Sequence, residues 1–160
     1  MAVDMFIKIE GIDGESQDEA HAGEIDVLSW QWGAVNKGSA ALGGGLGSGK
    51  VEVQDLHFTH FIDKASPLLF LCCCNGKHIP EAKLTCRRAG ENPLEYLVIT
   101  MKNVLVSQVQ PLGEADKDRP MERVGLNFGE VEVKYTPQKA DGTGDAEVTA
   151  GWNISKNVKL

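Results

Sequence analysis

Apolar and polar residues alternate along most of this chain, and that alternation restricts the fold more than any other feature. A period of two residues places apolar side chains on one face of a β-strand, whereas a surface helix repeats every 3.6 residues. The alternating segments are short, are separated by turn residues such as Asp13-Gly14, and are not joined by helical crossovers. The pattern predicts about seven to nine antiparallel strands in a mainly β fold, a compact β-barrel of two wrapped sheets that forms one domain over residues 1–160. The expected strands cover residues 3–9, 24–33, 50–60, 82–88, 94–109, 122–137 and 148–157.

One short segment has the signals of an α-helix. Ser66 is suited to the N-cap, Pro67 to the first helical position and Gly76 to the residue after the last turn. The side chains between them are apolar nearly all round the helix, so we expect the helix to be covered on most sides.

The cysteines of this segment favour packing over chemistry. Cys72, Cys73 and Cys74 are consecutive, and neighbouring side chains on a helix diverge by ~100°, so the three cannot share a metal ion. The Cys-x-x-Cys spacing of zinc sites is absent. We expect small, buried, reduced thiols, with structural zinc as the weaker alternative, and no metal or cofactor site.

Small residues dominate a loop over residues 33–49, which ends at Lys50. Its last part has the G-x-x-x-x-G-K spacing of a phosphate-binding loop. Such a loop also needs a Ser or Thr after the lysine and a helix that begins there. Val51 follows instead, within an alternating stretch typical of a strand. The context argues against nucleotide binding, and the stretch is interpreted as an extended glycine-rich loop.

No residue pattern of a familiar catalytic site is present. His57 and His60 are three positions apart and therefore lie on opposite faces of a strand, which excludes a ligand pair. Trp30 and Trp32 share one face with Leu28 and are interpreted as core residues. The acidic connection over residues 11–24 is expected to be a solvated loop. Arg87 and Arg88 are expected to be solvated or interface charges and not substrate clamps. We therefore predict that the protein is not an enzyme.

Charge and hydropathy exclude several partners. The formal net charge of −7 argues against nucleic-acid binding, which needs a basic face. No segment approaches the ~18 consecutive apolar residues of a membrane helix. Asp4 and Lys8 interrupt the N-terminus, which lacks the basic head of a signal peptide. We expect a protein that stays in the cytoplasm or leaves it without a cleavable signal.

Several stretches, taken together and in order, resemble the Hcp (haemolysin co-regulated protein) family, which forms the inner tube of bacterial type VI secretion systems. The resemblance spans essentially the whole chain and is far more specific than any single motif above. It is carried by "MAVDMFIKIEGIDGES", "HAGEIDVLSWQWG", "GKVEVQDLHFTHFIDKASP", "GKHIPEAKLTCRRAG", "EYLVITMKNVLVS", "LNFGEVEVKYTPQKADG" and "GWNISKNVKL".

The resemblance implies a β-barrel with one helix at its side that assembles into six-membered rings. Rings stack into a tube, which a contractile sheath fires outward with a spike protein at its tip, and small effector proteins can be carried in the lumen. The protein would be in the bacterial cytoplasm before firing and secreted afterwards. The glycine-rich segment resembles the loop that reaches a neighbouring subunit or the next ring. The residues expected in this subunit-interface or ring-stacking loop are Gly43, Gly44, Gly45, Leu46, Gly47, Ser48, Gly49 and Lys50.

Two other functions are kept as alternatives. The chain could be a binding module for small effectors that does not assemble into a tube. It could also be an enzyme that hydrolyses a nucleotide through Lys50, in which case Lys50→Ala would abolish the activity. Since the resemblance runs to Leu160, we expect no toxic effector domain at the C-terminus.

Overall fold

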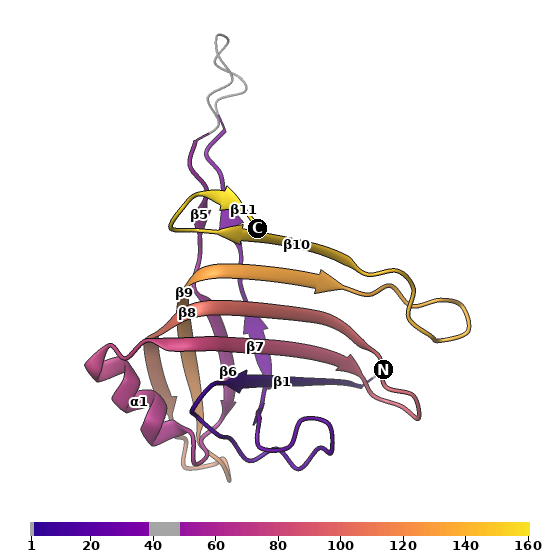
Figure 1. Ribbon diagram of the computed structural model, residues 1–160. Coiled ribbons are helices and arrows are strands. Elements are labelled where there is room, and N and C mark those ends of the chain that lie inside the picture. Colours follow the sequence, from indigo (N-terminus) through magenta and orange to yellow (C-terminus); the bar gives the residue numbers. More distant parts are fainter. Residues whose placement is uncertain (1, 39–48) are drawn as a thin grey trace.

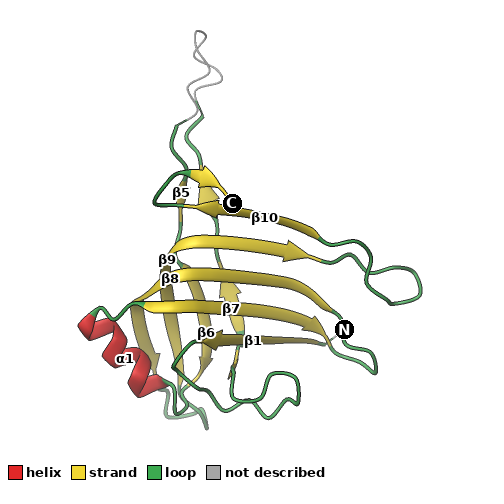
Figure 2. Cartoon of the chain, in the orientation of Figure 1, coloured by secondary structure: helices red, strands yellow, loops and turns green. Residues whose placement is uncertain are grey.

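The computed structural model describes residues 2–38 and 49–160, and their fold is mainly β with antiparallel pairing throughout (Figure 1). One α-helix lies beside the sheet, as the secondary-structure colouring shows (Figure 2). The elements are β1 (Val3–Ile9), β2 (Ile25–Asp26), β3 (Ser29–Gln31), β4 (Ala34–Val35), β5 (Glu52–Val53), β6 (Leu56–Phe61), α1 (Ser66–Asn75), β7 (Ile79–Arg88), β8 (Glu95–Leu112), β9 (Met121–Tyr135), β10 (Val148–Asn153) and β11 (Val158–Lys159).

The largest sheet has the order β11-β10-β9-β8-β7-β1-β2, and its long strand β9 changes partner half-way. Along residues 121–126, β9 pairs with β6 on one side and β8 on the other. Along residues 130–135 its partner on the first side is β10. The sheet therefore forks beyond Leu126, with β6 diverging from β10. This fork is the feature that creates the pocket described below.

The sheet wraps back on itself at the segment that joins β2 to β3. β2 pairs with β1, whereas β3 pairs with β6. Between them, Val27 donates a backbone hydrogen bond to Met5 and Leu28 donates one to Thr59, at 2.9 and 2.8 Å. The mainly β, antiparallel fold is thus confirmed. The wrap is made by these two single hydrogen bonds and not by a continuous ladder closing a barrel.

The core lies inside this wrap and follows from the strand alternation. In β6, Leu56, Phe58 and His60 are buried while the residues between them are half-buried. The sequence of β9 alternates in two phases, which predicts a bulge at Gly129, where the phase changes. The buried phase does change there. The predicted bulge is wrong, because the register between β8 and β9 is unbroken at Gly129. The register shift lies in β8, between Val106 and Gln108.

The second expected strand is interrupted, and the predicted inward face is right for Trp30 and Trp32 but wrong for Leu28. Ile25 and Val27 are in the core, whereas Leu28 is 40% exposed. Trp30 and Trp32 are half-buried and pack against the edge of the core. The third expected strand is also divided, into β5 and β6. The division falls at Gln54-Asp55, where the apolar residues change parity and a bend is predicted.

The helix begins and ends close to the predicted residues, but its cap differs. Ala65 is the residue before the helix, and its N–H donates to the carboxylate of Asp63 at 2.8 Å. The Ser66 hydroxyl accepts a hydrogen bond from the Asp63 N–H at 3.1 Å, which completes a reciprocal capping arrangement. Gly76 ends the helix in the left-handed conformation with φ 64°, as predicted.

Candidate assembly surface

The root of the glycine-rich loop is the part of the predicted interface that the structure describes. Gly49 and Lys50 are exposed there, beside the two-stranded β4–β5 hairpin. A Cβ added to Gly49 would lie 2.9 Å from the carbonyl oxygen of Lys37, so the two arms approach too closely for a larger residue. The other predicted interface residues lie outside the described residues: Gly43, Gly44, Gly45, Leu46, Gly47 and Ser48.

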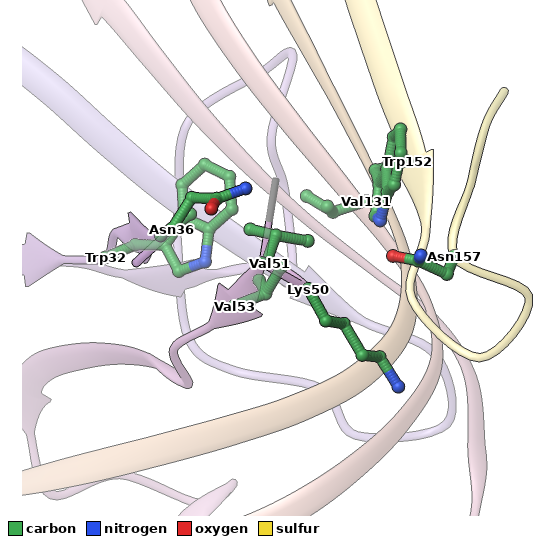
Figure 3. Close-up of a pocket in the computed structure, with 10 residues that line it drawn as sticks. Trp32, Asn36, Lys50, Val51, Val53, Val131, Trp152 and Asn157 are labelled. Atoms are coloured by element: carbon green, nitrogen blue, oxygen red, sulfur yellow. The ribbon is translucent and has the colours of Figure 1, made fainter. Parts of the chain in front are cut away.

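A pocket of about 560 Å³ lies in the fork between this hairpin root and the β10–β11 turn (Figure 3). We call it the fork pocket. The first half of β9 pairs with β6 and the second half pairs with β10 along the same edge. Because β6 and β10 diverge from each other, a space is left between them. The pocket is lined by Trp32, Ala34, Asn36, Gly49, Lys50, Val51, Val53, Val131, Trp152 and Asn157.

Two residues that line the fork pocket bury their indole nitrogens. Among the described residues, the nitrogens of Trp32 and Trp152 have no hydrogen-bond partner. An indole N–H can only donate, and a buried donor left unpaired costs about 1–3 kcal/mol. Among the lining residues that the structure describes, Lys50 is the one that carries a charge. The pocket therefore combines apolar walls with one positive charge, which suits an acidic guest.

A second incomplete surface is the outer face of α1. Leu68, Phe70 and Leu71 are 44%, 62% and 54% exposed, although the helix buries Leu69 and Cys72 against the core. The expectation that this helix is covered on most sides is therefore wrong for the single chain. Contiguous exposed apolar side chains are characteristic of surfaces that contact another protein.

The cysteines of α1 lie partly against the core and partly on the exposed face of the helix. Cys72 is buried, Cys73 is half-buried and Cys74 is exposed, and all three are free thiols. The prediction of buried reduced thiols is right for Cys72 and wrong for Cys74. Within residues 2–38 and 49–160, no three metal-ligating side chains gather into a candidate metal site.

The acidic connection before β2 is packed against the sheet, contrary to the predicted solvated loop. Arg87 is buried, and its guanidinium donates to Asp18 at 2.5 and 3.0 Å and to Asp4 at 3.0 Å. His21 is also buried and lies 2.8 Å from the carboxylates of both Glu24 and Glu95. The sequence did not indicate the Arg87 contacts or the His21–Glu95 contact, because these partners are distant along the chain.

Acid should weaken the Asp18 contact over a defined range. The hydrogen bond from Arg87 lowers the pKa of Asp18 from 3.8 to about 2. A lowered pKa in the folded state contributes stability above the unfolded value, and that stability is lost as the pH falls through the folded value. We therefore expect the difference in unfolding free energy between the native protein and Asp18→Asn to be constant above pH about 4 and to shrink toward pH about 2. Urea denaturation of both proteins across that range measures it, and a difference that does not change with pH would contradict the assignment.

The histidines of β6 lie as predicted, on opposite faces of the strand. His60 is buried and its Nε2 lies 2.7 Å from the Glu122 carboxylate, whereas His57 is half-buried.

The described helix is ten residues long, and no described helix has the length and apolar character needed to cross a membrane.

Comparison with known proteins agrees with this arrangement. The family model described as "Type VI secretion system effector, Hcp" matches residues 6–135. The chain is 58% identical over 161 residues to Protein hcp1 of Pseudomonas aeruginosa, with 99% of both chains covered. It superposes on the crystal structure of Hcp1 from Salmonella typhimurium with a TM-score of 0.84, at 43% identity and full coverage of both chains. A structure titled as a type six secretion system protein gives a TM-score of 0.94 at 30% identity, covering 99% of this chain and 100% of the other.

The fold and the surface define an antiparallel β protein whose single chain leaves an apolar helix face exposed to solvent. The comparisons then place it: the chain belongs to the Hcp family of type VI secretion proteins. Members of this family are secreted components of the type VI system and oligomerise. The resemblance noted from the sequence is confirmed.

Proposed function

We propose that this protein is the structural subunit of a type VI secretion inner tube, in which six copies form a ring and rings stack. In this proposal a contractile sheath exports the tube with a spike protein at its tip, and small effector proteins are carried in its lumen. The loop from Gly43 to Lys50 would contact a neighbouring subunit or the next ring.

The observation that carries the proposal is the unfinished surface of the single chain. An exposed apolar helix face is unfavourable in a protein that stays monomeric. Contacts with further copies would cover such surfaces. A ring uses one heterologous contact repeated until it closes, so each chain must offer two different surfaces, and this chain has several that are incomplete.

The proposal predicts a particle of six chains. Light scattering after size exclusion should give six times the 17.3 kDa mass of the chain, and negative-stain electron microscopy should give six-fold rings with an open centre. Dilution from roughly 100 μM to 1 μM, which is the span over which weak assemblies dissociate, tests whether the ring persists. A monomer at every concentration would overturn the ring and favour an effector-binding module instead.

A further inference from the structure

Two aromatic walls and one positive charge characterise the fork pocket. Trp32 and Trp152 lie on opposite walls of the pocket (Figure 3). Lys50 adds a positive charge at the hairpin root. None of the described lining residues is acidic, although the chain has 23 acidic residues and a net charge of −7. A partner that complements this pocket therefore carries carboxylate groups.

A second copy of this chain is the partner that the structure supports best. Family members oligomerise, and a heterologous contact joins two different surfaces of the same molecule. In Figure 1 the β10–β11 turn beside the pocket lies at one end of β10, and the loop over residues 138–147 extends from the other end. A head-to-tail arrangement along β10 would bring the loop of one copy to the pocket of the next.

The loop over residues 138–147 has the matching charge. It contains Asp141, Asp145 and Glu147 against the single positive charge of Lys139, and its residues are almost all exposed. The other exposed acidic connection, residues 113–120, is less suitable. It is nearly balanced in charge, with two basic and three acidic residues.

This loop is also preorganised, which lowers the entropic cost of docking. Lys139 donates a backbone hydrogen bond to Thr143 at 2.7 Å, and Asp145 donates one to Pro137 at 2.7 Å. Asp141 accepts two hydrogen bonds from Thr143, both on its Oδ1. Asp145 accepts one, from the Ala146 N–H on its Oδ1, and is the less engaged of these two carboxylates.

We propose that the fork pocket is the receptor for the loop 138–147 of a copy in the next ring, with Asp145 facing Lys50. This inference rests on the proposed self-assembly and deepens it, because it names the two surfaces that meet between successive copies. It also gives a role to Lys50, which the sequence singled out as part of an interface.

A charge exchange tests the pairing. Ring mass by light scattering and ring stacking by sedimentation velocity would be measured separately for Lys50→Glu, Asp145→Lys and the double variant. We expect each single variant to form rings of unchanged mass but to need about tenfold more protein to stack, since one weak contact is repeated around the ring. The double variant should recover most of that loss. Single variants that stack like the native protein, or a double variant no better than the worse single, overturn the pairing.

If Lys50→Glu leaves stacking unchanged but lowers effector retention, the pocket's occupant is an effector and the proposal is wrong. A native chain that never associates overturns both this pairing and the proposed tube, whereas rings that stack independently of these residues overturn the pairing alone.

Discussion

Replacing Glu122 with alanine is expected to lower the free energy of unfolding by about 3–5 kcal/mol, because it isolates a buried histidine. Glu122 and His60 face each other across β9 and β6 and are 3% and 1% exposed. Their side chains meet at 2.7 Å between Oε1 and Nε2. Among the residues that the structure describes, the Nδ1 of His60 has no hydrogen-bond partner, and the Asp63 carboxylate is 3.8 Å from it. Glu122→Ala would leave the imidazole without a hydrogen bond at either nitrogen.

Urea denaturation at pH 7 measures this effect, with Glu122→Gln as the control. Burial alone would raise the pKa of Glu122, but hydrogen bonds from His60 and Ser66 outweigh burial and hold the pKa below its ordinary value. The carboxylate is therefore charged at neutral pH. The amide keeps an acceptor for His60, so we expect it to lose only about 1–2 kcal/mol. All proteins must be compared at one chain concentration, because self-association adds to the apparent stability. An alanine variant that loses less than the glutamine variant would contradict the pairing.

The positions of the strands could be predicted from the sequence because alternation is a local property. Leu56 and Phe58 repeat every two residues, and that period alone places both in the core of β6. The end of α1 could be predicted for the same reason, since Gly76 in the left-handed conformation acts on its own turn. The long strands β8 and β9 begin and end within a few residues of their predicted bounds.

Features that depend on a distant partner could not be predicted. Arg87 is buried because Asp18 and Asp4 come to it from other segments, and nothing near it in the sequence indicates them. The exposed face of α1 contradicts the expectation that this apolar helix is buried on most sides. An apolar helix is stabilised by burial, but the single chain buries only one side of this helix.

The candidate site also has one part that could be predicted from the sequence and one part that could not. Its glycine-rich loop is visible in the composition of residues 33–49, and the resemblance to a family gave that loop an expected role. The fork pocket was missed, because Trp32 and Trp152 are far apart along the chain and meet only through the partner change of β9. Trp152 had no signal of its own beyond being a large aromatic residue in an expected strand.

Leu126→Ala is expected to destabilise the protein by about 2–5 kcal/mol, because Leu126 is the fully buried residue at which the sheet begins to fork. Its side chain is 0% exposed. It pairs with Leu56 of β6 and with Val106 of β8, immediately before β9 exchanges β6 for β10. Three strands are already fixed around this position, so the cavity left by the shorter side chain cannot collapse easily, and the cost of the lost contacts is retained.

Two matched variants separate the cavity from other effects. Leu126→Met nearly conserves volume and should lose less than about 1.5 kcal/mol. Leu112→Ala removes the same atoms from a leucine that is 59% exposed at the end of β8, and should change stability by no more than about 0.5 kcal/mol. Because Leu126 joins β6, β8 and β9, its loss should shift unfolding measured by circular dichroism and by tryptophan fluorescence to the same urea concentration. Separate transitions would mean that the hairpin root and the fork pocket unfold independently of the core, and the fork would then not be held by Leu126.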